Sequence, residues 1–307
     1  MREWSPHSYE KISIFSDYLQ QFAVAAGSAT NRVYIDAFGG DTVNVLRGSG
    51  RTFAGSAEIA LAIEPPFSHL RFFELKAGRA AALRRLIASD PRRASVIEGD
   101  CNSTMAGVLA GLPVQAPTFA FLDPDGMELN WSTIRMLADH KRRYANETGK
   151  SKVEMWVLFS SAGIVRVLGS NRQLALEKGF PEKIARLYGA WGPWERVWEA
   201  KLDGEISGGD AKKAYLFLYM DRLASLGYRH LLVRPIENSR NELFAMVFVT
   251  DHPAGASIMK WAVERDRAIP EPGTLFDAVE SRPPYEDLHT GWRESFPIEL
   301  PEWEELG

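Results

Sequence analysis

Short apolar segments alternate with helix-forming segments along the first half of the chain, and this alternation limits the folds open to it. Five segments are rich in β-branched and aromatic residues: "NRVYIDAF", "HLRFFEL", "RASVIEG", "PTFAFLDP" and "VEMWVLFSS". The stretches between them, such as "GRAAALRRLIAS" and "NSTMAGVLAGL", have the composition of helices. Strands that are apolar along nearly their whole length are typical of parallel sheets buried on both faces. The pattern therefore predicts an α/β fold with helices on both faces of the sheet.

A helix is also predicted before the first strand. The segment "EKISIFSDYLQQFAVAAG" repeats apolar residues at intervals of three and four, which places one apolar stripe along a helix. We expect this stripe to lie against the sheet. It comprises Ile12, Phe15, Tyr18, Leu19 and Phe22.

The segment at residues 210–251 predicts how the last strands of the sheet are connected. A helical segment, "DAKKAYLFLYMDRLASLG", leads to two β segments, "YRHLLVRPIEN" and "LFAMVFVTD", joined by the short link "SRNE". So short a link requires antiparallel strands, because a parallel return needs about a dozen residues. Five β/α units followed by such a pair are the strand plan of Rossmann-like class I methyltransferases. We therefore predict a mostly parallel sheet of about seven strands with the last strand antiparallel, and a helical insertion at about residues 164–208, after strand five.

Length and composition favour one large domain. The chain has 307 residues, of which 45% are hydrophobic, enough to bury a full α/β core. We assign residues 1–276 to this domain and 277–307 to an acidic C-terminal tail. Neither a signal-like start nor an apolar run of about 18 residues is present, which predicts a cytoplasmic protein with no membrane partner. A single cysteine, Cys101, excludes an internal disulfide and any cysteine-rich metal site.

The net charge of −4 hides an uneven distribution. Residues 271–307 hold ten acidic residues and two arginines, so residues 1–270 hold 34 basic and 30 acidic residues. Two basic runs lie in the body, at 76–93 and 141–152. Such runs are usually solvated helix faces, so nucleic acid as a partner has weak support.

The ends of the predicted strands carry the candidate cofactor-binding residues. In a doubly wound sheet, ligands bind at the carboxyl ends of the strands. Strand one ends in an acid and two glycines. The acid can accept a hydrogen bond from the ammonium group of a ligand, and the glycines let the backbone approach the ligand closely. Strand two ends in an acid that can accept both hydroxyls of a ribose. The predicted cofactor-binding residues are Asp36, Phe38, Gly39, Gly40, Glu74, Asp100, Cys101 and Asn102.

The first of these loops departs from the dinucleotide-binding pattern. The fingerprint G-x-G-x-x-G is absent, and the interval from Asp36 to Glu74 exceeds the usual one of about 20 residues. Residues 41–54 therefore represent an insertion. Each acid taken alone is more typical of a helix N-cap or a turn than of a ligand contact. Acids at three consecutive strand ends together favour a common cleft.

Strand four ends in Asp123, Pro124 and Asp125, the predicted catalytic residues. In amino-group methyltransferases an acid or Asn followed by two prolines and an aromatic orients the target nitrogen, and here only the Asp-Pro half is present. "PDG" is also an ordinary turn signal. A third interpretation is a metal-dependent nuclease that holds Mg²⁺ on Asp123, Asp125 and Glu128, but no lysine follows to complete a nuclease pattern.

Two further groups have alternative interpretations. Trp191, Trp194 and Trp198 either form a stacking platform for bases or pack within a small helical layer, and packing is favoured. His252, in "TDHPAG", is either a general base or a structural residue at the start of the closing helix, and the structural role is favoured.

Taken together, several segments resemble the three-Cys-motif partner proteins of bacteria and phage. They span roughly residues 7–276 and are "HSYEKISIFSDYL", "YIDAFGG", "GSAEIALAI", "FFEL", "GDCN", "FAFLDPDGMEL" and "ELFAMVFVTDHPAGASIMKWA". The chain differs from the family at the first glycine turn and at Asp125, where the family has an aromatic. The acidic tail lies outside the resemblance.

The resemblance implies a methyltransferase-like fold and a partner protein with a three-cysteine motif, related to radical S-adenosylmethionine proteins. Combined with the strand-end residues, it predicts a protein that binds S-adenosylmethionine and acts as a methyltransferase. The main alternative is a non-catalytic partner that uses the fold to bind a protein or nucleic acid.

Overall fold

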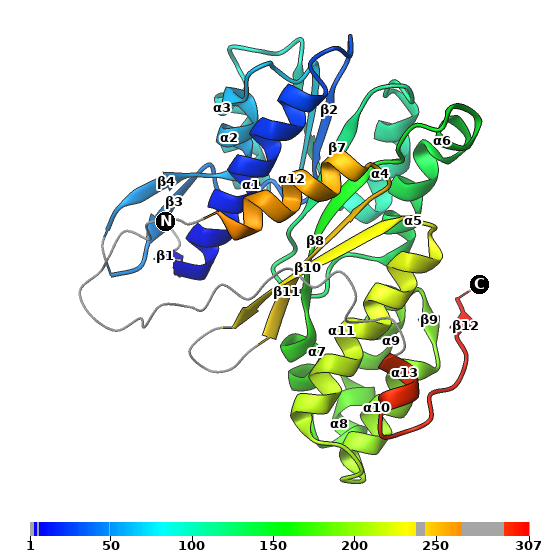
Figure 1. The fold of residues 1–307 in the computed structure, drawn as a ribbon. Coiled ribbons are helices and arrows are strands. Elements are labelled where there is room, and N and C mark those ends of the chain that lie inside the picture. The colour runs from blue at the N-terminus through cyan, green and yellow to red at the C-terminus, as the bar shows by residue number, and fades with distance from the viewer. Residues whose placement is uncertain (1–2, 5, 49, 238–242, 266–291, 307) are drawn as a thin grey trace.

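The computed structural model describes the whole chain except residues 1–2, 5, 49, 238–242, 266–291 and 307. Its centre is a seven-stranded sheet in the order β10-β11-β8-β7-β2-β5-β6 (Figure 1). The strands are β2 (Val33–Asp36), β5 (His69–Glu74), β6 (Ala94–Glu98), β7 (Thr118–Leu122), β8 (Glu154–Ser160), β10 (His230–Glu237) and β11 (Leu243–Thr250). Only β11 runs against its neighbours, β8 and β10. This confirms the predicted sheet, with its last strand antiparallel.

One face of the sheet is covered by α1 (Pro6–Ala25), α2 (Ser56–Ala62), α3 (Ala77–Leu86) and α12 (Pro253–Glu264). The apolar stripe predicted for α1 is buried here: Phe15 is fully buried and its ring lies 4.5 Å from that of Phe121. Tyr18 packs against Phe119 and Phe248 in the same layer. The sheet face and the helices therefore share one aromatic core.

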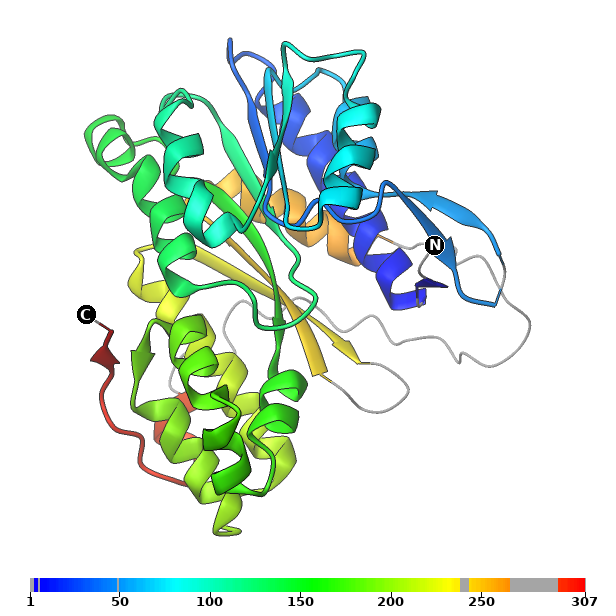
Figure 2. The ribbon, with the colours of Figure 1, turned by 180° about the vertical axis from the view of Figure 1, so that it is seen from behind.

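The other face is covered by α4 (Cys101–Ala110), α5 (Trp131–His140), α7 (Ser161–Leu168) and α11 (Gly208–Ser225), as the reverse view shows (Figure 2). A short helix, α6 (Arg142–Thr148), follows α5. Inward-facing residues of the sheet, such as Ile35, Leu122 and Val157, join this second core. Both faces of the central strands are thus buried, as their continuous apolar sequence predicts.

The insertion predicted at residues 41–54 forms a small sheet of its own. β3 (Val43–Leu46) and β4 (Thr52–Ala54) form an antiparallel hairpin, and β1 (Glu3–Trp4) pairs in parallel with β3. The ring of Tyr9 on α1 meets that of Phe53 edge-on at 5.5 Å. The segment after the first glycine turn is therefore ordered against the start of α1.

A helical lobe follows β8, where the sequence predicts an insertion. After α7 it contains α8 (Arg172–Glu177), α9 (Phe180–Tyr188), the two-residue strand β9 (Ala190–Trp191) and α10 (Pro193–Leu202). Trp194 is fully buried and Trp198 nearly so, while Trp191 is half-buried with its ring 5.3 Å from that of Trp194. The tryptophans therefore pack within the lobe, and the preference for packing over a base-stacking platform is confirmed.

The end of the predicted acidic tail packs against this lobe. α13 (Trp292–Ser295) buries Trp292, and β12 (Glu304–Glu305) pairs antiparallel with β9. In Figure 1 this red segment runs beside α9 and α10. Residues 266–291, which include the start of the predicted tail, lie outside the described part.

We expect the α1 layer to contribute strongly to stability. Phe15→Ala removes a fully buried ring from contact with four aromatic neighbours, so urea denaturation should show a loss of about 3–5 kcal/mol in the free energy of unfolding. Val24→Ala, at a position of the same helix that is 54% exposed, serves as the control and should change it by less than about 0.5 kcal/mol. Equal effects would show that α1 does not pack as described.

Candidate functional site

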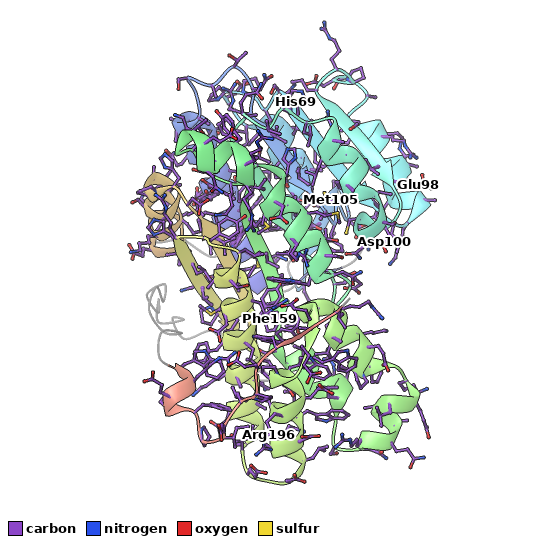
Figure 3. The ribbon with its side chains drawn as sticks, turned by 90° about the vertical axis from the view of Figure 1, so that its right-hand side faces the viewer. His69, Glu98, Asp100, Met105, Phe159 and Arg196 are labelled. Carbon is purple, nitrogen blue, oxygen red and sulfur yellow. The ribbon has the colours of Figure 1, made fainter. Side chains whose placement is uncertain are left out.

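The parallel strands place the predicted site residues along one edge of the sheet. β2, β5 and β6 end in Asp36, Glu74 and Glu98, and Asp123 follows β7 directly. Figure 3 shows Glu98 and Asp100 on the side of the sheet that faces the helical lobe, with His69, the first residue of β5, at the opposite edge. The loops that follow the four strands therefore share the carboxyl edge.

Asp36 is completely buried and bonded to other parts of the protein. Its carboxylate accepts hydrogen bonds from Ser56 Oγ at 2.6 Å, from Tyr34 Oη at 3.0 Å and from the Phe38 backbone N–H at 3.2 Å. Burial raises the pKa of Asp36 to about 6, although these donors act to lower it. Here Asp36 joins β2, α2 and the first loop, and its predicted contact with a cofactor stays a prediction.

The glycine turn is bonded to the end of the next strand. Gly39 N–H donates to the Phe73 carbonyl at 2.7 Å, and a Cβ at Gly39 would lie 2.8 Å from Leu83 Cδ1. Gly40 has a φ of +63°, which favours glycine, and its N–H donates to Glu74 Oε2 at 3.0 Å. The two glycines therefore allow the turn to pack closely on β5 and α3, and both of their N–H groups are used within the protein.

Glu74 connects the first loop to the second. Oε2 accepts from Gly40, and Oε1 accepts from the Lys76 backbone N–H at 2.7 Å. The Glu74 side chain is buried, and of the about four acceptor positions of a carboxylate the protein itself uses two. Phe38, the other predicted residue of the first loop, is half-buried beside the core.

Leu75 was not among the predicted site residues. It follows Glu74 directly, before α3 begins, and 69% of it is exposed. An exposed apolar side chain beside an acid offers apolar contact to a ring system. The sequence alone shows an apolar residue directly after the acid at the end of this strand, so Leu75 could have been named as a candidate.

The loop after β6 contains Asp100, Cys101 and Asn102. Asp100 is the N-cap of α4 and accepts from the backbone N–H of Asn102 at 2.9 Å and from its side chain at 2.8 Å. Cys101 is buried, and burial raises the pKa of its thiol to about 12, which keeps it protonated at neutral pH. The N-cap role suggested for such acids is therefore present at Asp100, and its contact with adenine stays a prediction.

Asn102 joins this loop to the one after β7. Its Oδ1 accepts from the Asn130 backbone N–H at 2.9 Å and from Thr133 Oγ1 at 2.8 Å, while its Nδ2 donates to the Glu128 carbonyl at 2.8 Å. All polar atoms of this amide are therefore bonded within the protein. Asn102 acts here as a link between two loops of the predicted site.

Asp123 forms an ion pair with Lys11 of α1, and both side chains are largely buried. Pro124 is buried, and Asp125 is exposed in the turn that follows. The structure thus brings α1 to the predicted catalytic loop, a contact between residues 112 positions apart in the chain.

The nuclease interpretation gains no support from this arrangement. Within the described ranges, no three His, Cys, Asp or Glu side chains form a group suited to a metal ion. The Glu128 carboxylate accepts from the Gly126 backbone N–H at 2.7 Å, as expected for a turn residue.

His252 lies at the opposite edge of the sheet, because β11 runs against the parallel strands. It is the N-cap of α12, and its Nδ1 accepts from the Ala254 backbone N–H at 3.1 Å. Its favoured interpretation as a structural residue is confirmed. The same edge holds buried Glu154, which accepts from Tyr18 Oη; burial raises the pKa of Glu154 to about 7.

A cavity of about 780 Å³ lies between α4, α5, α9 and the C-terminal residues. Leu109, Met136 and Leu306 provide apolar surface, and Arg135 and Arg186 provide charge. None of the predicted site residues lines it. Asn130 and Trp131 do, so the cavity adjoins the end of the loop that follows β7.

Comparison with known proteins gives only distant structural likenesses. No family model and no curated protein sequence matches the chain, so the resemblance to three-Cys-motif partner proteins stays a prediction. A Legionella pneumophila protein of the family model DUF519 aligns with a TM-score of 0.49 and 10% identity, over 80% of this chain and 88% of that one.

Two similar structures are provisionally described as methyltransferases. One, from Escherichia coli, has a TM-score of 0.33 and 13% identity over 76% of this chain and 84% of its own. The other, from Staphylococcus aureus, is provisionally a caffeoyl-CoA O-methyltransferase, with a TM-score of 0.34 and 9% identity over 76% and 82%. The methyltransferase-like fold rests on the strand order of the sheet itself.

Among the described residues, no helix combines the length and the apolar character needed to cross a bilayer.

Asp36 should make stability depend on pH. Its raised pKa means that the folded state binds more protons than the unfolded state between about pH 4 and 6, so stability falls as pH rises through this range. The rise in the pKa of Asp36 from 3.8 to about 6 corresponds to a fall of about 3 kcal/mol in the free energy of unfolding across this range. In Asp36→Asn this fall should be absent. Urea denaturation from pH 4 to 7 measures it. Because the pKa of Glu154 is raised to about 7, the difference in stability between Glu154→Gln and the wild type should change at a higher pH, nearer pH 6. If stability depended on pH in the same way in both variants, the assignment of the fall at lower pH to Asp36 would be contradicted.

Proposed function

We propose that the chain binds S-adenosylmethionine at the carboxyl edge of the sheet and transfers its methyl group. The observation that carries the proposal is the hydrogen bond from Gly40 N–H to Glu74, which joins the glycine turn to the acid beside exposed Leu75. On this fold, ligands bind in the crevice outside the carboxyl ends of the strands.

The residues at this edge suit the parts of the cofactor. Glu74 keeps two acceptor positions for the ribose hydroxyls, and Leu75 offers apolar surface to the adenine ring. The turn from Phe38 to Gly40 lies beside them and would hold the methionine part, and Asp100 would lie at the adenine edge. Asp36 would support the turn from inside the protein, since its buried carboxylate accepts three hydrogen bonds there.

When bound, the cofactor supplies a methyl group on a positively charged sulfur, and transfer needs mainly alignment of the acceptor with that carbon. The chain's own contribution is therefore orientation. Asp123 lies at the end of β7 and its carboxylate is held by Lys11, which fixes its position. We assign to Asp123 the orientation of the acceptor, with Pro124 and Asp125 shaping the turn.

Binding should depend on Glu74 and on Leu75. Hydrogen bonds to charged groups contribute about 1.5–3 kcal/mol, so Glu74→Gln should weaken S-adenosylmethionine binding about tenfold or more in calorimetry. Leu75→Ala should weaken it about fivefold, through the loss of about 1 kcal/mol of apolar contact, without lowering stability because Leu75 is exposed.

One matched control lies on the neighbouring strand. Glu98 ends the neighbouring strand, is paired in register with Glu74, and forms an exposed ion pair with Arg84. Glu98→Gln should leave the affinity unchanged. The absence of binding heat at high protein concentration, with the wild-type chain folded, would sink the proposal.

One observation favours a second function, a non-catalytic partner of a three-cysteine-motif protein. The Asp123 carboxylate is already neutralised by Lys11. If Asp123 serves only to join α1 to β7, Asp123→Asn should leave complex formation with the partner unchanged in size-exclusion chromatography, and should leave the activity of the complex unchanged as well. A loss of methyl transfer with the complex intact would decide for catalysis.

A further inference from the structure

The C-terminal strand is held by an unusual arrangement around one arginine. Arg222 of α11 is only 5% exposed, and its guanidinium donates to both carboxylate oxygens of Glu305 on β12. Its Nε also donates to the Tyr188 carbonyl at 2.9 Å. The hydrogen bonds from Arg222, and its positive charge, lower the pKa of Glu305, so the pair is charged at neutral pH.

Two tryptophan rings lie next to the same guanidinium. The Arg222 Cζ atom lies 4.9 Å from the centre of the Trp131 ring and 5.1 Å from that of Trp303. Such cation–π contacts hold a planar guanidinium in one orientation. Trp303 belongs to the C-terminal segment, whereas Trp131 belongs to the main domain.

Trp131 is the first residue of α5 and follows directly after the loop that begins with Asp123. It is 3% exposed, and the lobe holds its ring on another side, because a Cβ at Gly189 would lie 2.1 Å from Trp131 Cδ1. Gly189 has a φ of +72° and its carbonyl accepts from the Leu306 backbone N–H at 3.0 Å. The start of α5 is therefore clamped by the lobe and by the C-terminal strand.

The contacts continue from α5 into the loop after β6. Asn130, the residue before Trp131, donates its backbone N–H to Asn102, and Thr133 donates its hydroxyl to the same oxygen. Asn102 in turn donates its backbone N–H to Asp100. An unbroken series of contacts thus runs from Glu305 to both loops of the candidate site.

We propose that the C-terminal strand positions the loops after β6 and β7, through Glu305, Arg222 and Trp131. The proposal rests on the function proposed above, since these loops carry Asp100 and Asp123. Glu305, Arg222 and Trp131 are positioning residues: they act on the site through α5 and Asn102. Without Glu305, the guanidinium keeps one carbonyl and two ring faces as partners, so Trp131 loses a fixed neighbour.

The test compares two adjacent acids of β12. Glu305→Gln removes the charge that Arg222 binds, whereas Glu304→Gln removes an exposed charge from the same strand and serves as the matched control. Hydrogen exchange is measured at the backbone amides of Asn102, Asn130 and Thr133, each of which has an acceptor in the structure. Tyr34 and Ile35 in the centre of the sheet report global opening.

We expect Glu305→Gln to speed exchange at the three loop amides about three- to tenfold, with no change at Tyr34 and Ile35, and Glu304→Gln to have no effect. A purely structural role would move the loop and sheet amides together. Unchanged loop amides, or a parallel rise at Tyr34 and Ile35, would overturn the proposal.

Calorimetry with S-adenosylmethionine on the wild type, Glu305→Gln and Glu304→Gln separates this proposal from the proposed function. A threefold or greater loss of affinity in Glu305→Gln alone supports both. If the wild type does not bind the cofactor while the loop amides still respond, the proposed function fails and the positioning role stands. If the wild type binds and the loop amides do not respond, the positioning role fails and the function stands.

Discussion

Burial of both faces of the central strands is the constraint on which the rest of this structure depends. β2 is buried along its whole length, and it contacts one core through Tyr34 and the other through Val33 and Ile35. A sheet covered in this way needs a helical crossover between parallel strands. The crossovers bring β2, β5, β6 and β7 back in the same direction, so the loops after these strands meet at one edge. The candidate site follows from this packing requirement.

The periodicity of the sequence was sufficient to predict most of the fold. The strand segments, their mostly parallel direction, the antiparallel last strand and the helical lobe follow from local patterns of apolar residues, from one short link and from the analogy with the strand plan of class I methyltransferases. The docking of residues 292–306 could not be predicted, because it depends on Arg222 and on an edge offered by β9, both far away in the chain. Exposed acids such as Glu304 and Glu305 look alike in sequence, and only the position of an arginine distinguishes them.

The positions of the candidate residues at the strand ends could be predicted from the sequence, whereas their roles as ligand contacts stay predictions. The sequence indicated that Asp36, Glu74, Asp100 and Asp123 would lie at neighbouring strand ends, which requires only the strand order. It did not indicate which carboxylates are used inside the protein. Asp36 is bonded to Ser56 of α2, 20 positions away, and Asp123 to Lys11 of α1, 112 positions away. Pairings between such distant residues carry no local signal, whereas the exposed Leu75 beside Glu74 carried one that was overlooked.

The acids of the carboxyl edge therefore differ in how many of their acceptor positions the protein itself uses. A buried carboxylate without donors costs several kcal/mol, so the three donors to Asp36 are a condition of its burial. Glu74 is buried as well, and it accepts from two backbone N–H groups, so about two of its acceptor positions are not used by the protein. Both polar atoms of the Asn102 side-chain amide form hydrogen bonds that connect the two loops. An edge in which most polar groups bond to one another is rigid before a ligand arrives, and the ordering cost of binding is correspondingly small.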